Sequence, residues 1–178
     1  AGLERLGISD HGPGSMSYGI DMKKIPQMRQ DIEECRKLYP DLKIELGVEA
    51  NIINQSGALD ITKEEQSLFD YIIAGYHYSY LGEKPLRGIG VVVGGWLHEH
   101  GITSSVHARN YNTDFMVNTI LANRIDIVSH PGDKASFDIA QIAKACEEKG
   151  TVMEINRHHN GLSVEGIRIA MDYDVKFI

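Results

Sequence analysis

The chain has 178 residues, of which 42% are hydrophobic and 24% are charged, and its formal net charge is −7. This balance fits one globular domain with a buried core, and no apolar run is long enough to cross a membrane. The acidic charge, without a basic cluster, argues against long nucleic acid as a partner. The N-terminus has no signal-peptide pattern, so we expect a cytoplasmic protein in which Cys35 and Cys146 are buried thiols.

Short apolar runs alternate with amphipathic stretches in the first half of the chain. The strands expected here span residues 5–9, 43–48 and 70–76, and the helices span residues 25–39 and 64–68. Pro26 suits the first turn of the longer helix, and Pro40 stops it. The glycine-rich stretch 79–105 stays open, because its three consecutive valines could belong to a helix.

The second half continues the alternation, with clearer helix boundaries. One helix is expected to start near Thr113, a second is capped by Asp138 and closed by Gly150, and a third is capped by Ser163. The expected strands span residues 125–129, 151–155 and 175–178. Repeated strand–helix units with apolar strands predict a parallel sheet, and about six strands make up most of a barrel.

Residues that can carry chemistry stand where the expected strands end, which is where function gathers in parallel α/β barrels. These residues are His11, Glu49, His77, His130 and Glu154. Imidazole and carboxylate groups converging on one rim suit Zn²⁺, Fe²⁺ or Mn²⁺. Spacing alone leaves two alternatives, a metal site and an active site without metal, because barrel rims hold both.

Five short segments resemble, in the same order, motifs of the polymerase and histidinol phosphatase (PHP) superfamily. They are Gly7-Ile8-Ser9-Asp10-His11-Gly12, Gly47-Val48-Glu49-Ala50-Asn51-Ile52, Tyr76-His77, His130-Pro131-Gly132 and Glu154-Ile155-Asn156. Together they cover nearly the whole chain, and they look most like the small bacterial phosphatases of the superfamily. The resemblance implies an α/β fold, a distorted seven-stranded (β/α) TIM-like barrel, and metal-dependent hydrolysis of phosphate esters.

The resemblance also implies a divalent metal cluster of up to three ions. Glu49 would bridge two of them, and His77 and His130 would complete the ligands of one. His11 would bind the third. Zinc is the first choice of metal, with manganese or iron as alternatives. Two metals held in this way can clamp a phosphoryl group and generate a nucleophile from water, so Glu49, His77 and His130 are the expected catalytic group.

Two motifs of the superfamily have no counterpart. A His-x-His motif would precede Ala1 and an Asp-x-His motif would follow Ile178, so we expect residues 1–178 to form a partial PHP-like barrel domain, incomplete at both ends. His98-Glu99-His100 matches the His-x-His pattern, but it lies mid-chain, away from any expected strand end, and is assigned to the surface.

Further residues are expected around the metal ligands. Asp10 and Asn156 would support the ligands from behind, Asp10 by orienting an imidazole. Contacts to a substrate phosphate need cations or polar groups near the rim. The candidates are Tyr18, Arg109, Lys134 and Arg157.

The function expected first is a phosphomonoesterase acting on a small phosphorylated substrate. One alternative is a phosphodiesterase or nuclease that uses the same residues. Another is a PHP-like module that binds metal or ligand without turnover. The sequence leaves the natural substrate and the oligomeric state open.

Overall fold

The computed structural model describes residues 2–15, 18–77, 106–159 and 161–178. The first half comprises β1 (Arg5–His11), η1 (Met22–Lys24), α1 (Ile25–Leu38), β2 (Lys43–Asn51), α2 (Lys63–Gln66) and β3 (Tyr71–Gly75). The second half comprises α4 (Val106–Ala122), β4 (Ile127–Val128), α5 (Ile139–Lys149), β5 (Val152–Met153) and α6 (Val164–Ala170). Strands and helices alternate, so the predicted α/β class is confirmed.

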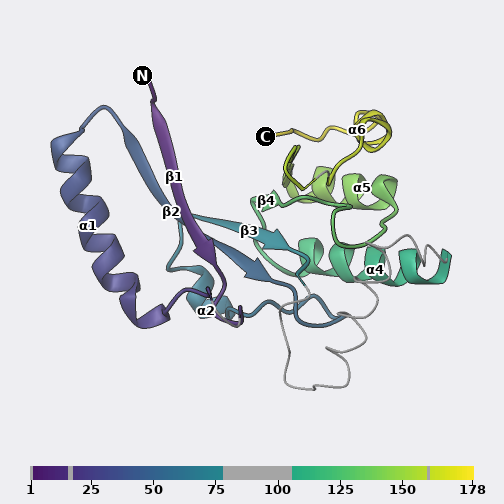
Figure 1. Cartoon of the computed structure of the whole chain (residues 1–178), viewed down its shortest axis with the longest axis horizontal. Coiled ribbons are helices and arrows are strands. Elements are labelled where there is room, and N and C mark those ends of the chain that lie inside the picture. The colour runs from purple at the N-terminus through teal and green to yellow at the C-terminus, as the bar shows by residue number, and fades with distance from the viewer. Residues whose placement is uncertain (1, 16–17, 78–105, 160) are drawn as a thin grey trace.

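The five described strands form one parallel sheet in the order β1-β2-β3-β4-β5, which is also their order along the chain. Right-handed connections between strands added in sequence place the helices on one face of a sheet, as in barrels. Figure 1 shows α1 beside β1 and β2, and α4 and α5 stacked together at the other end. Within the described residues β1 and β5 are the lateral strands, so closure into a barrel stays a prediction.

The two faces of β2 differ in character because successive side chains of a strand point to opposite sides. On one face the residues are buried and apolar, and the register continues this row across β3, β4 and β5. The row comprises Ile44, Leu46, Val48, Ala50, Ile72, Ala74, Val128 and Met153. Glu45, Gly47, Glu49 and Asn51 share the opposite face, so the polar groups of β2 lie away from this apolar row.

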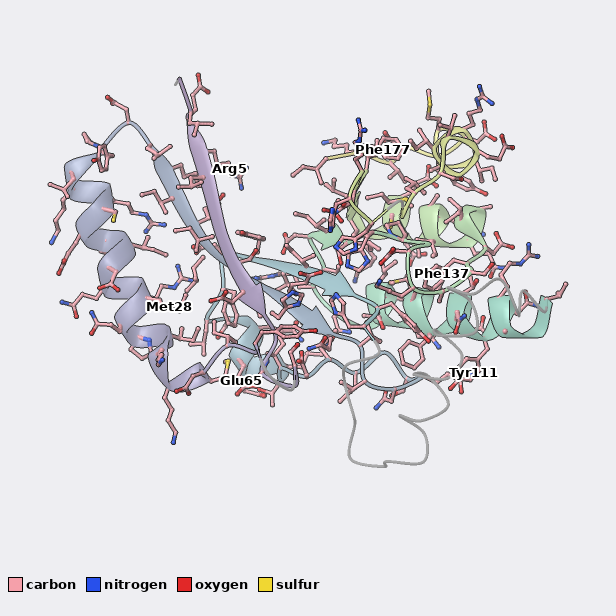
Figure 2. The ribbon with its side chains drawn as sticks, viewed as in Figure 1. Arg5, Met28, Glu65, Tyr111, Phe137 and Phe177 are labelled. Atoms are coloured by element: carbon pink, nitrogen blue, oxygen red, sulfur yellow. The ribbon has the colours of Figure 1, made fainter. Side chains whose placement is uncertain are left out.

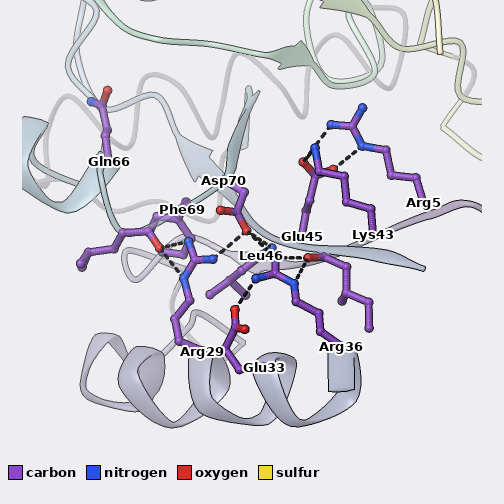
Figure 3. Close-up of polar contacts among 12 residues, drawn as sticks. Arg5, Arg29, Glu33, Arg36, Lys43, Glu45, Leu46, Gln66, Phe69 and Asp70 are labelled. Atoms are coloured by element: carbon purple, nitrogen blue, oxygen red, sulfur yellow. Dashed lines mark hydrogen bonds and ion pairs between the residues drawn. The ribbon is translucent and has the colours of Figure 1, made fainter. Parts of the chain in front are cut away.

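Helix α1 is tied to the sheet by arginines as well as by apolar contacts. Arg29 donates to the carbonyl oxygen of Leu68, and its Nη1 lies 2.7 Å from Oδ2 of Asp70 (Figure 3). The same Asp70 oxygen accepts the backbone N–H of Leu46. Arg36 donates to the carbonyl oxygen of Ile44. These bonds fix α1 against the start of β2 and the start of β3.

Several predicted boundaries agree with the structure, and the capping residues explain why. Asp138 and Ser163 accept backbone N–H groups at the starts of α5 and α6, as predicted. Gly150 closes α5 with φ 70°, a backbone conformation that glycine adopts without steric cost. The α1 boundaries are also confirmed, with Pro26 in its first turn.

Other predictions were wrong. Helix α4 begins at Val106 instead of near Thr113, because its first turns are exposed and lack the apolar pattern by which a helix is recognised. The last expected strand is reduced to a bridge between Met153 and Phe177. Cys35 is exposed, whereas Cys146 is buried as predicted, and burial raises the pKa of its thiol to about 12.

Candidate metal centre

Three neighbouring strands bring His11, Glu49 and His77 together at one end of the sheet. The register pairs His11 of β1 with Glu49 of β2, and His77 follows β3 two residues after Gly75. One ligand atom from each of these three residues lies within 4.8 Å of the other two. Parallel strands end on the same side of a sheet, which is why residues far apart in sequence meet here.

His130, from the end of β4, joins this group through the same glutamate. Its Nε2 lies 3.4 Å from Oε1 of Glu49, and Nε2 of His77 lies at the same distance from that oxygen. The rings of His77 and His130 meet edge to face, with centroids 5.2 Å apart. Glu49 therefore has imidazoles around both carboxylate oxygens, since Nδ1 of His11 lies 3.6 Å from Oε2.

The residues of this group fit a divalent cation. Nδ1 of His11 is buried and has no hydrogen-bond partner among the described residues. A buried nitrogen without a partner is costly unless a ligand or ion uses its lone pair. Two imidazoles and a carboxylate are a donor set that Zn²⁺, Mn²⁺ and Fe²⁺ accept. The His11–Glu49–His77 group can therefore hold a metal ion.

Glu49 is held in its charged form. Burial of its side chain raises the pKa of the carboxyl, but hydrogen bonds from His130, His77 and Ser129 outweigh burial and bring the pKa well below the usual range. The Ser129 hydroxyl donates to Oε1 over 2.8 Å. A carboxylate that stays ionised near neutral pH can bind a cation without first losing a proton.

A hydrogen bond to Asn51 sets the orientation of the His77 ring. Its Nδ1 lies 2.9 Å from Oδ1 of Asn51, and the Asn51 amide nitrogen donates to Asp60 and to Ser15. Because an ionised carboxylate can only accept, the amide nitrogen of Asn51 must face Asp60, and its oxygen must face His77. Nδ1 of His77 therefore carries a proton, and Nε2 is the ring atom that faces Glu49.

The segment before His77 is fixed by aromatic packing. Tyr76 is buried, and its ring meets Phe115 of α4 and Phe137 edge to face, with centroids 5.7 and 5.8 Å away. Figure 2 labels Phe137, which lies in the loop before α5. Gly75 leaves room for the His77 ring, since a Cβ at Gly75 would overlap it. The packing of Tyr76 thus fixes the backbone beside His77, and the absence of a side chain at Gly75 gives the His77 ring its space.

Asp60 ties the loop after β1 to the end of β2. Its carboxylate accepts the backbone N–H groups of Gly14 and Asn51, over 2.9 and 2.8 Å. A Cβ at Gly12 would overlap this carboxylate, so only glycine permits the close approach. Burial raises the pKa of Asp60 despite these hydrogen bonds. Asp60 was not among the residues predicted from the sequence, although two glycines so near His11, Gly12 and Gly14, were a signal of close backbone approach.

The predicted supporting residues differ in their placement. Asp10 is exposed and contacts no imidazole within the described part of the chain, because it precedes His11 on β1 and so points to the other face of the sheet. Asn156 donates to Glu154 over 3.0 Å, and Glu154 accepts the backbone N–H of His130. Asn156 is therefore linked to the proposed ligand His130 through Glu154, a residue whose place at a strand end was predicted but whose contact with His130 was not.

The predicted substrate-binding residues lie at different distances from the group. Tyr18 is 51% exposed, and its ring centroid is 4.8 Å from that of His11. Nζ of Lys134 lies 3.1 Å from the carboxylate of Asp133, which also has His159 Nδ1 at 3.3 Å. His159 in turn packs on His130, with centroids 4.9 Å apart, so Lys134 is near the group.

The remaining candidates are less directly placed. Arg157 is exposed in the loop after β5, in the segment that also carries His159. Arg109 is exposed on α4, and only its carbonyl oxygen has a described contact, with Thr113. His98-Glu99-His100 lies outside the described residues.

Among the described helices, none has the length and apolarity needed to cross a bilayer.

Comparison with known proteins adds names to this geometry. No protein-family model matches the sequence. The chain is 28% identical over 160 residues to a probable phosphatase from Acetivibrio thermocellus, covering 88% of this chain and 54% of that protein. Over 171 residues it is 26% and 24% identical to probable phosphatases from Shewanella sp. (strain ANA-3) and Shewanella oneidensis, covering 93% of this chain and 55% of each relative.

These similarities support a phosphatase family. The chain spans about half the length of the curated relatives it matches. The matched part includes most of this chain and therefore most of the strands that carry the candidate ligands.

Proposed function

We propose that this chain carries the active-site rim of a metal-dependent phosphomonoesterase of the PHP superfamily. The observation that supports this most directly is the convergence of His11, Glu49 and His77 with a buried, unpartnered nitrogen on His11. The relatives named probable phosphatases support the reaction class. The order of the five PHP-like segments supports the superfamily.

Each ligand has a role in this proposal. Glu49 would offset the charge of bound cations, His77 and His130 would serve as further ligands beside it, and His11 would bind a neighbouring cation. Zinc is the first choice, with manganese or iron as alternatives, and up to three ions in the complete protein. A bound divalent metal supplies polarisation of a phosphoryl oxygen and a nucleophile from water near neutral pH.

The side chains contribute positioning and charge. Asn51 holds the His77 proton on Nδ1, so the electron pair of Nε2 can bind a cation. Lys134 and Arg157 offer positive charge to the substrate phosphate, and Tyr18 lines the approach to His11. Arg109 is the weakest of the proposed contacts. The net charge of −7 favours a small phosphorylated substrate over long nucleic acid.

Phosphate release from p-nitrophenyl phosphate by the purified chain tests the proposal. We expect release in the presence of Zn²⁺ or Mn²⁺, loss of release with a chelator, and loss in Glu49→Gln. Glu45→Gln is the matched control, because Glu45 lies on the same strand and the same face. Its activity should equal that of the parent.

Other outcomes distinguish the alternatives. Cleavage of bis(p-nitrophenyl) phosphate in preference to the monoester would replace the proposal with a phosphodiesterase. Tight metal binding with no turnover of either ester would replace it with a binding module. Activity that survives both the chelator and Glu49→Gln would contradict a metal-dependent reaction at this site.

A further inference from the structure

The backbone of His130 adopts a conformation that side-chain-bearing residues rarely use. Its φ is 32°, and it is the one described residue other than glycine with a positive φ. Crowding between Cβ and the backbone disfavours this region for residues other than glycine. Such a conformation persists where surrounding contacts determine it, and His130 is a proposed ligand.

A carboxylate holds the N–H of this residue. Oε2 of Glu154, just after β5, accepts the backbone N–H of His130 over 2.7 Å. Oε1 of the same side chain accepts the amide of Asn156 over 3.0 Å, so both carboxylate oxygens are engaged.

Glycines let the loop after β5 press directly on this backbone. A Cβ added at Gly161 would lie 2.6 Å from both Cα and the carbonyl carbon of His130, closer than real contacts allow. Gly132, with φ 105°, faces the carbonyl oxygen of Gly161 with the same lack of space. The loops after β4 and β5 therefore touch backbone to backbone at the residue that carries the ligand.

The same loop reaches the proposed substrate side. Oδ1 of Asn156 accepts the N–H groups of His158 and His159, over 2.9 and 3.1 Å. The ring of His159 packs on that of His130. The segment that carries Glu154, His159 and Gly161 thus contacts the amide, the Cα and the ring of His130.

We propose that Glu154 and Gly161 clamp the backbone of His130 and so aim its imidazole at Glu49, which makes Glu154 a positioning residue for metal binding. This inference rests on the proposed function, because it takes His130 to be a ligand. Glu154 acts through the reach of its oxygen to the His130 amide, and its negative charge is secondary. Shortening the side chain should therefore matter more than neutralising it.

A matched pair of conservative variants separates reach from charge. Glu154→Gln removes the charge and keeps an oxygen that can accept the His130 N–H, with its NH2 turned towards the Asn156 amide. Glu154→Asp keeps the charge and withdraws the oxygen from the His130 N–H. In titrations with Zn²⁺ against a competing chelator, Glu154→Asp should bind at least about tenfold more weakly than the parent, and Glu154→Gln within about threefold. Glu148→Ala, an exposed acid on α5, is the control and should bind like the parent.

A second readout needs no metal. Hydrogen exchange at the His130 amide in the metal-free chain should be faster by about tenfold in Glu154→Asp and in Gly161→Ala, and close to the parent in Glu154→Gln. Melting temperatures of all variants establish that each is folded under the conditions of measurement.

The outcomes are distinct. Equal loss of Zn²⁺ affinity in both Glu154 variants would overturn the clamp in favour of a charge effect, and no loss in either would overturn it as well. If the parent chain binds no metal, the proposed function fails, and exchange at the His130 amide still decides whether the clamp exists.

Discussion

Two glutamates on the same face of β2, Glu45 and Glu49, meet opposite surroundings. Glu45 lies among permanent cations: Arg5 donates to both of its oxygens, and Nζ of Lys43 lies 2.7 Å away (Figure 3). Glu49, four residues further along the strand, lies among imidazoles and a serine hydroxyl. Arginine and lysine neutralise a carboxylate permanently, whereas imidazoles leave their lone pairs to a cation. The neighbours of an acid on this strand thus decide whether it is held in an ion pair or is available to a cation.

The largest expected effect is the loss of metal binding in Glu49→Gln. The amide has no charge and only one acceptor oxygen, so we expect Zn²⁺ affinity to fall more than about 100-fold, beyond what outer contacts cause. Equilibrium dialysis with elemental analysis measures it. Glu45→Gln should keep the parent stoichiometry, and equal losses in both variants would remove the distinction between the two glutamates.

The next effect concerns the glycine between them. A Cβ at Gly47 would overlap the ring of Tyr71, which lies across the sheet at this point. We expect Gly47→Ala to lower the free energy of unfolding by about 1–3 kcal/mol, as in other overpacked sites. Urea denaturation measures the change. Introduced into Tyr71→Ala, the same substitution should cost less than half as much, and an unchanged cost would show that the ring is not the obstacle.

A smaller effect is expected from the hydroxyl that contacts Glu49. Ser129→Ala removes the donor at 2.8 Å from Oε1, so we expect Zn²⁺ affinity to fall about tenfold. Competition with a chelating dye gives the affinity. The exposed Ser67, directly after α2, provides the control, Ser67→Ala, which should bind like the parent. Parent-like binding by Ser129→Ala would mean that imidazoles alone hold the carboxylate.

The smallest effect belongs to the cationic surroundings. Hydrogen bonds from Arg5 and then Lys43 lower the pKa of Glu45. Because Arg5 is largely exposed, we expect Glu45→Gln to lower the free energy of unfolding at pH 7 by less than about 1 kcal/mol. The contribution is complete above the unfolded pKa, about 4.3, and is lost as pH falls through the folded value. Urea denaturation between pH 7 and pH 2 should show the two proteins converging in acid; divergence would contradict the assignment.

The sequence predicted much of the fold because the helix ends carry local signals. Caps such as Asp138 and Ser163, and stops such as Gly150, act within one turn, so they can be read without the tertiary structure. The start of α4 could not be found, because its exposed first turns carry no apolar stripe. The prediction that Cys35 is buried was wrong because the side of α1 that carries it is not covered by other residues. Ile8 of β1, the strand beside α1, is exposed as well.

The residues that support the ligands were harder to predict than the ligands themselves. Asp60 reaches Asn51 from the loop after β2, and Ser129 reaches Glu49 across the sheet, so both contacts depend on the tertiary structure. Glu154 did leave a signal. Glu49-Ala50-Asn51 and Glu154-Ile155-Asn156 repeat the pattern Glu-x-Asn at two strand ends, one carrying a proposed ligand and the other holding a ligand's backbone.

The sequential strand order has a consequence for biosynthesis. Since β1, β2 and β3 are neighbours both in the sheet and along the chain, a nascent polypeptide that has emerged as far as His77 already carries His11 and Glu49. His130, just after β4, is synthesised later, and Glu154, which accepts its backbone N–H, later still. The His11–Glu49–His77 group can therefore begin to assemble while translation continues, and His130 joins it afterwards.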